Sequence, residues 1–163
     1  MEKTQGYNYR IEKDSIGSKD VPVDVYYGVQ SLRAAENFHI TGLNMHPEII
    51  KSVTYIKKAS AITNCEVGLL EKDRAEAIVQ ACDEILAGKF FDNFIVDPIQ
   101  GGAGTSLNMN ANEVIANRAI EILGGEKGNY SIVHPNDHVN YGQSTNDVIP
   151  TAGKMTALRL LEQ

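Results

Sequence analysis

Two long stretches with helical periodicity, lying between Pro47 and Gly88, constrain the fold of this 163-residue chain most strongly. The first should run from Pro47, a residue suited to a first helical turn, to about Leu70, and the second from near Lys72 to Gly88, a good C-terminal glycine. The residues that define this pattern recur at three- and four-residue spacing: in the first stretch Ile50, Val53, Ile56-Lys57, Ala61 and Val67, and in the second Ala75, Ile78-Val79, Cys82 and Leu86. The pattern predicts two antiparallel helices with a short connection.

Strand signals are confined to the N-terminal part of the chain. Residues 9–12 alternate polar and apolar side chains, as a small strand does, but this is too little to build a sheet. Residues 21–30 are interrupted by Pro22 and Gly28 and predict an irregular, partly buried arm. A short helix is expected over residues 31–37, with Ser31 as its cap. The predicted fold class is mainly α and multihelical, with a small extended N-terminal arm or hairpin.

Composition excludes several classes of protein. A net charge of −6 with scattered basic residues gives no reason to expect nucleic acid as a partner, and no apolar run is long enough to span a bilayer. A cytoplasmic, globular protein is therefore expected. Cys65 and Cys82 are expected to be buried free thiols. The four histidines and the cysteines lack zinc-ligand spacing, so we expect no metal site.

A glycine-rich stretch over residues 100–106 precedes a helix predicted from about Leu107 to Leu123. Either Thr105 or Ser106 is a suitable cap for this helix. The stretch matches neither a P-loop nor a dinucleotide-binding motif, which makes nucleotide binding a weak hypothesis. The helix contains several asparagines, which are poor residues for a helix interior, so they indicate partners elsewhere in the fold or water on an exposed face: Asn108, Asn110, Asn112 and Asn117.

A polar stretch over residues 134–151 predicts a loop that runs into a helix. Four successive residues are preferred caps, and Pro150 should lie in the first helical turn: the caps are Ser144, Thr145, Asn146 and Asp147. The unpaired N–H groups at the start of a helix, with hydroxyls beside them, form a site for an anion such as a carboxylate or phosphate. An ordinary capped helix behind a surface loop is the alternative reading.

Taken together, the two polar stretches resemble the aspartase/fumarase superfamily. The matching motifs are Gly101-Gly102-Ala103-Gly104-Thr105-Ser106 with Asn108-Met109-Asn110, Asn112-Glu113-Val114, and His134-Pro135-Asn136-Asp137-His138-Val139-Asn140 with Gln143-Ser144-Thr145-Asn146-Asp147. Residues 10–14, 21–22 and 26–30 are also similar to the family's N-terminal region. The resemblance therefore covers nearly the whole chain.

The resemblance implies a carbon–nitrogen lyase that needs no organic cofactor. Ala103-Gly104-Thr105-Ser106 and Ser144-Thr145-Asn146 are similar to the aspartase branch, which eliminates ammonia from L-aspartate to give fumarate. His134-Pro135-Asn136-Asp137 is closer to the class II fumarase branch, which acts on malate and fumarate. We therefore favour the aspartase branch and keep the fumarase branch as the alternative. In either branch the intermediate is an aci-carboxylate with two negative charges, which fixed hydrogen-bond donors stabilise as it forms.

The resemblance also implies roles for individual residues. Thr105, Ser144 and Thr145 would donate hydrogen bonds to the substrate carboxylate, and Asn146 would help to hold the amino group. These four residues are the predicted catalytic and substrate-binding set.

A second set of residues matches positions outside the main site. His134, Asn136 and Asp137 match a secondary anion site of fumarases. No acid–base role is implied for His134 or His138, and Glu113 is expected to be a helix-face residue.

Members of the superfamily are much longer than this chain and carry a Gly-Ser-Ser-x-x-Met-Pro-x-Lys-x-Asn loop, with the catalytic base, that this sequence lacks. We therefore expect residues 1–143 to form an N-terminal lyase domain and residues 144–163 to begin the first long helix of a central bundle. The isolated chain should be inactive, and the complete enzyme should be a homotetramer. The competing hypothesis is a non-catalytic helical interaction module.

Overall fold

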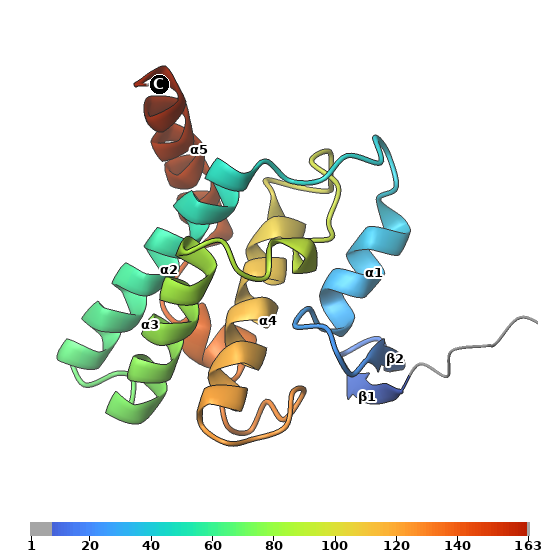
Figure 1. Ribbon diagram of the computed structural model, residues 1–163, viewed down its shortest axis with the longest axis vertical. Coiled ribbons are helices and arrows are strands. Elements are labelled where there is room, and N and C mark those ends of the chain that lie inside the picture. Colours follow the sequence, from blue (N-terminus) through green and yellow to red (C-terminus); the bar gives the residue numbers. More distant parts are fainter. Residues whose placement is uncertain (1–7, 163) are drawn as a thin grey trace, which may run out of the picture.

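A mainly helical architecture with one small hairpin is formed by residues 8–162, the part of the chain that the computed structural model describes (Figure 1). This confirms the predicted fold class. The elements in order are β1 (Tyr9–Lys13), β2 (Ser18–Pro22), α1 (Val29–Asn37), α2 (Pro47–Glu66), α3 (Lys72–Leu86), the 3₁₀ turn η1 (Phe91–Asn93), α4 (Thr105–Ile122), the π-helical turn η2 (Pro135–Val139) and α5 (Thr145–Leu161).

The predicted pair of helices is α2 and α3, which pack against each other through a short connection. Pro47 is the first residue of α2, and His46 caps it by accepting a hydrogen bond at Nδ1 from the Glu48 N–H. The helix ends at Glu66, earlier than predicted, because Gly68 adopts a left-handed conformation (φ 76°) and turns the chain. Leu70 is buried after this turn rather than inside the helix.

Helix α4 lies at the centre of the fold. It packs against α3 on one side and α1 on the other, and 13 of its 18 residues are buried (Figure 1). The largest fully buried apolar side chains come from β2, from helices α1 to α4 and from the segment between η1 and α4: Val21, Val29, Ile50, Val53, Ile78, Ile85, Val96, Val114, Ile115 and Ile120. A helix buried nearly all round explains why its polar residues need partners inside the protein.

The N-terminal strand signal was correct, and the hairpin is one of the two forms that the predicted fold class allowed, although the second strand was not located. Strands β1 and β2 form an antiparallel hairpin with Tyr9 opposite Pro22. Residues 18–20 lack an apolar alternation, so they gave no strand signal, and the expected irregular arm starts only after Pro22.

The predicted cap of α1 was wrong. The helix begins at Val29 with Gly28 as N-cap, and Ser31 is buried in its first turn. The N–H and hydroxyl of Ser31 donate hydrogen bonds to Glu113 on α4, as described below.

Helix α5 begins where predicted, with Ser144 as N-cap. Pro150 lies in the second turn rather than the first. Its missing N–H removes one hydrogen bond from the Asn146 carbonyl, and Asn146 is exposed to water, which limits the cost. Part of the expected loop before α5 is instead the π-helical turn η2.

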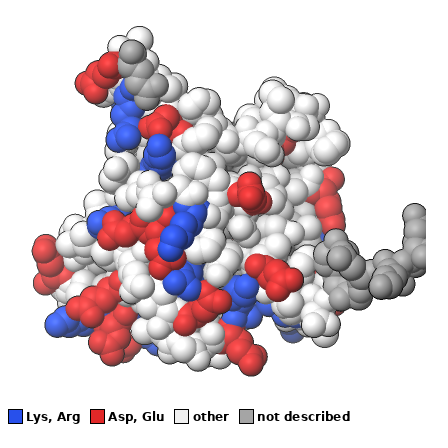
Figure 2. Space-filling view, in the orientation of Figure 1, with Lys and Arg blue, Asp and Glu red and all other residues white. Residues whose placement is uncertain are grey.

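The surface carries charges of both signs. On the face shown in Figure 2, acidic and basic side chains are interspersed rather than gathered into a basic patch. Within residues 8–162 we find no helix that is long and apolar enough to cross a membrane.

Candidate active site

The first turn of α5 presents the predicted polar residues. Ser144 Oγ accepts a hydrogen bond from the Asn146 N–H at 3.2 Å. Ser144 and Asn146 are exposed, and Thr145 is half-buried. The start of the helix carries partial positive charge from its unpaired N–H groups, although the exposed Asp147 carboxylate belongs to the same turn.

The start of α4 lies against α5. Gly104, its N-cap, is left-handed (φ 79°), and a Cβ placed on it would lie 2.7 Å from Ile149 Cγ2. Glycine is therefore required for this close approach. The prediction that Thr105 or Ser106 caps the helix was wrong, since the side-chain acceptor in its first turn is Gln100, whose Oε1 accepts a hydrogen bond from the Leu107 N–H at 2.7 Å. Thr105 is exposed at the first helical position, and no hydrogen bond of its hydroxyl is found in the described part of the chain.

Asn108 joins the two helix starts. Its Nδ2 donates to Thr145 Oγ1 at 3.0 Å and to Asn140 Oδ1 at 3.1 Å. Thr105 precedes Asn108 by one turn on the same helix face. The structure thus brings the first turns of α4 and α5 together. Thr105 lies in the first of these turns, and Ser144, Thr145 and Asn146 lie at the second. Two adjacent helix N-termini with hydroxyl donors can bind a carboxylate.

Behind this arrangement lies a buried lysine that the sequence analysis did not single out. Lys57, in the middle of α2, is fully buried, and its Nζ donates to Asn140 Oδ1 at 2.7 Å and to Gln143 Oε1 at 3.0 Å. Burial lowers the pKa of Lys57 to about 7. The sequence did contain a signal that could have identified Lys57, because it is a charged residue on the apolar face of a helix, between Val53 and Ala61.

The residues of the predicted secondary anion site lie around η2. His134 Nδ1 accepts hydrogen bonds from the N–H groups of Asn136 and Asp137, both at 3.2 Å, and so caps the turn. His134 and Asn136 line a cavity of about 500 Å³ together with Lys13 and Arg33. Asp137 is exposed, with its carboxylate 3.3 Å from His134 Nδ1.

The second histidine of this motif also serves the backbone. His138 Nδ1 accepts a hydrogen bond from the His134 N–H at 2.8 Å. Burial lowers the pKa of His138 and favours its neutral form, which this hydrogen bond requires.

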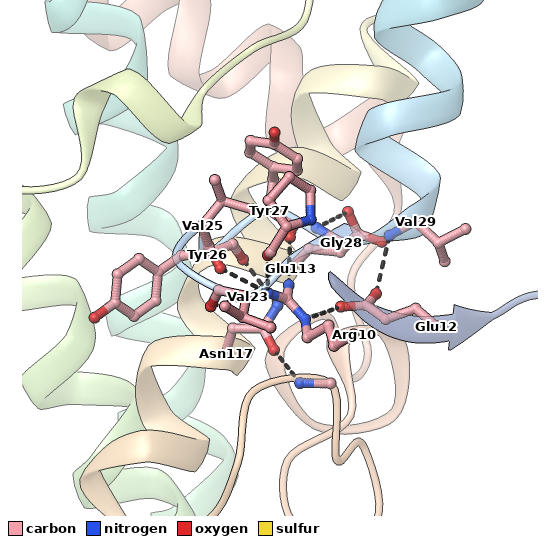
Figure 3. A network of polar contacts seen from close by, with 12 residues as sticks. Arg10, Glu12, Val23, Val25, Tyr26, Tyr27, Gly28, Val29, Glu113 and Asn117 are labelled. Carbon is pink, nitrogen blue, oxygen red and sulfur yellow. Dashed lines mark hydrogen bonds and ion pairs between the residues drawn. The ribbon is translucent and has the colours of Figure 1, made fainter. Parts of the chain in front are cut away.

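Glu113 was predicted as a helix-face residue, and this was wrong because it is almost fully buried. Its carboxylate accepts hydrogen bonds at the start of α1 from the N–H groups of Gly28, Gln30 and Ser31 and from Ser31 Oγ. Figure 3 shows Glu113 beside Gly28. Burial raises the pKa of Glu113, opposed by the hydrogen bonds from Ser31 and Gln30. A Cβ on Gly28 would collide with this carboxylate, so glycine is needed there.

A second buried carboxylate completes the network in Figure 3. Glu12 accepts a hydrogen bond from the Val29 N–H and pairs with Arg10 at 2.7 Å, as Figure 3 shows. It also accepts a hydrogen bond from the Tyr130 hydroxyl. The Arg10 guanidinium also donates to the Pro22 carbonyl at the end of β2 and to two carbonyls of the loop before α1, those of Val25 and Tyr27. This network fixes the hairpin and α1 against α4, so its role is structural.

The cysteines and other metal-binding residue types form no site in the described part of the chain. Cys82 is buried, burial raises the pKa of its thiol, and Cys65 is partly exposed, with no disulfide between them. No group of three or more His, Cys, Asp or Glu side chains within residues 8–162 is arranged to hold a metal ion.

Known proteins that resemble this chain identify its family. A family model described as Lyase matches residues 17–163. The chain belongs to this lyase family. An aspartate ammonia-lyase of Bacillus sp. is 62% identical over 154 residues, covering 94% of this chain and 33% of the relative. A class II fumarate hydratase of Halobacterium salinarum is 54% identical, with coverage of 94% and 33%.

A solved structure of a lyase-family member has the same fold. It is described as fumarate lyase:delta crystallin from Brucella melitensis, is 50% identical and superposes with a TM-score of 0.90, covering 91% of this chain and 34% of its own. This chain spans about a third of the length of the curated relatives that it matches.

Proposed function

We propose that this chain supplies the carboxylate-binding side of an active site for the reversible anti elimination of ammonia from L-aspartate, which gives fumarate. The observation that carries the proposal is the meeting of two helix starts, joined by the hydrogen bond from Asn108 to Thr145. The printed names of several relatives, aspartate ammonia-lyases from different bacteria, support the same reaction.

The difficult step is removal of the proton beside the β-carboxylate, because it generates an aci-carboxylate with two negative charges. Thr105, Ser144 and Thr145 donate hydrogen bonds to this group, and Asn146 helps to hold the amino group. Donors that are fixed before the reaction stabilise the developing charge without reorganisation. The N–H groups at the starts of α4 and α5 add partial positive charge.

A second candidate is the class II fumarase reaction, which interconverts malate and fumarate. It is favoured by the Halobacterium salinarum relative and by the cavity beside His134 and Asn136, for which we propose a secondary anion site. Lys13 and Arg33 line the same cavity, as do the carboxylates of Glu113 and of Asp14, which pairs with Arg33 at 2.9 Å. We propose that the Lys13 ammonium supplies the positive charge for an anion.

We also propose an assembly for the complete enzyme. Residues 144–163 begin the first long helix of a central bundle, and residues 1–143 form the N-terminal domain. Apolar side chains exposed towards the end of α5 support burial of this helix in a homotetramer: Leu158, Leu160 and Leu161. We propose a cytoplasmic location.

Two chimeras test the reaction. In one, this chain replaces the matching third of the Bacillus sp. aspartate ammonia-lyase, and in the other it replaces that of the Halobacterium salinarum fumarate hydratase. We expect the first to form fumarate from aspartate at a rate near that of its parent and the second to be much slower than its parent with malate. The opposite pattern would favour the fumarase reaction. The isolated chain should form no fumarate from either substrate.

A further inference from the structure

Lys57 is an unusual residue because its ammonium is buried without a carboxylate. Its side chain is fully buried, and within residues 8–162 its hydrogen bonds go to two neutral amide oxygens, those of Asn140 and Gln143. Burying a cation in this way is costly unless something offsets the charge.

The groups that the neighbouring elements place around Lys57 provide no negative charge to offset its ammonium. From α3 the Cys82 thiol interacts with it, and burial raises the pKa of this thiol, so it stays neutral. From α4, Asn108 reaches the shared Asn140 oxygen and contributes an amide. The next lysine, Lys58, already pairs with Asp83 at the surface.

A chain of hydrogen bonds connects this cation to the proposed carboxylate site. Lys57 donates to Asn140 Oδ1, the same oxygen accepts from Asn108 Nδ2, and that nitrogen also donates to Thr145 Oγ1. Asn140 itself is held by a hydrogen bond from its Nδ2 to the Gln143 carbonyl. The ammonium therefore sits three hydrogen bonds from the Thr145 hydroxyl.

We propose that Lys57 is a positioning residue of the carboxylate site: its ammonium fixes Thr145 through Asn140 and Asn108 and supplies positive charge that the bound substrate carboxylate offsets. This rests on the proposed function, since it requires an anion at the helix starts. Asn108 Oδ1 belongs to the same buried cluster and has no hydrogen-bond partner within residues 8–162.

The proposal predicts that anion binding is linked to proton uptake. Without a ligand the pKa of Lys57 is about 7, lowered by burial. An anion near the ammonium favours the protonated form and raises this pKa. Binding of a dicarboxylate therefore takes up a proton above about pH 7, and its affinity falls as pH rises from there towards the higher pKa of the complex.

Calorimetric titration of the aspartate ammonia-lyase chimera with succinate, a dicarboxylate that cannot react, tests this. Titrations in buffers of different ionisation enthalpy give the number of protons taken up. We expect uptake to be near zero at pH 6 and to increase towards pH 8. Lys57→Met should abolish the uptake and weaken binding roughly 10-fold or more at pH 7. In the Lys57→Met chimera the KM for aspartate should rise by a larger factor than the factor by which kcat falls.

Two further variants keep the test decisive. Lys57→Arg retains a permanent charge, so it should bind succinate better than Lys57→Met but without proton uptake near pH 8. Lys58→Met is the matched control and should take up protons as the unchanged chimera does. Unchanged uptake in Lys57→Met, or no uptake by the unchanged chimera while it binds succinate, would overturn the role of Lys57 and leave the proposed reaction standing. Failure of the unchanged chimera to bind succinate would overturn both.

Discussion

The Asn108 side-chain amide on α4 donates a hydrogen bond to the Thr145 hydroxyl at the start of α5, with a distance of 3.0 Å between Nδ2 and Oγ1. The two residues are 37 positions apart in the sequence. This contact fixes the direction of the Thr145 hydroxyl, because the oxygen accepts from Asn108 and its hydrogen points elsewhere. A hydroxyl held in this way is a ready donor for a carboxylate.

Loss of the Asn108 amide should therefore impair catalysis more than folding. In the aspartate ammonia-lyase chimera we expect Asn108→Leu to lower kcat/KM for aspartate by about 10–100-fold, since Thr145 loses its fixed orientation. Steady-state rates of fumarate formation check this.

Asn117→Leu is the matched control, because Asn117 lies on the same helix but bonds the Tyr26 carbonyl and the Gly128 N–H far from Thr145. It should lower the melting temperature and leave kcat/KM almost unchanged. Equal losses of activity in both variants would show that Asn108 matters only for folding.

Replacing two other asparagines of α4 should have different effects on stability. Asn110 accepts from the Ile95 N–H and donates to the Asn93 carbonyl, whereas both polar atoms of the buried Asn112 side chain lack partners within residues 8–162. Asn110→Leu should lower the free energy of unfolding of the chain by about 2 kcal/mol, and Asn112→Leu should leave it unchanged or raise it by about 1 kcal/mol. Urea denaturation measures both, and a large loss in Asn112→Leu would contradict the prediction.

The buried Glu113 carboxylate should be necessary for α1. Replacement by Ala leaves the N–H groups of Gly28, Gln30 and Ser31 without their acceptor and should cost about 3–5 kcal/mol in the free energy of unfolding. Glu113→Gln keeps one acceptor oxygen and should cost less, about 1–2 kcal/mol. Urea denaturation at pH 7 compares them, and a Gln variant that is as unstable as the Ala variant would argue against hydrogen bonding as the cause.

Lys57 should make the stability of the unliganded chain depend on pH. Its pKa is about 7 in the folded state and 10.5 for an exposed lysine, so between these values the unfolded state binds more protons. The free energy of unfolding should therefore rise with pH, by about 5 kcal/mol across the whole window and by about 3 kcal/mol between pH 6.5 and 9.5. Lys57→Met should remove the rise and Lys58→Met should keep it, as measured by urea denaturation at pH 6.5 and 9.5. If the free energy of unfolding rises equally with pH in both variants, groups other than Lys57 cause the rise.

Local signals in the sequence were sufficient for much of the fold. Pro47 and Gly88 marked ends of the α2–α3 pair, and Ser144 marked the start of α5, because capping chemistry acts within a few residues. The anion site at α5 could be proposed for the same reason. The asparagines of α4 indicated either partners in the fold or water on an exposed face, and three of them have partners: Asn108, Asn110 and Asn117.

Contacts between distant parts of the chain could not be predicted in the same way. Glu113 caps a helix that begins more than 80 positions earlier, and nothing near either segment shows this. The Ser31 cap was wrong for this reason, since the acceptor comes from α4. Lys57 gave a signal, a charge on an apolar helix face, but its partners Asn140 and Gln143 become visible only when α2 packs against the end of η2.

The initial rate of fumarate formation from aspartate by the aspartate ammonia-lyase chimera, with and without Thr145→Val, tests the central claim most directly. Valine keeps the shape of threonine and removes the hydroxyl. The account predicts an active chimera whose kcat/KM falls by roughly 100-fold or more on this substitution, with most of the activity retained in Thr145→Ser. A Thr145→Val chimera that turns over aspartate as fast as the unchanged one would contradict the proposed role of this helix start.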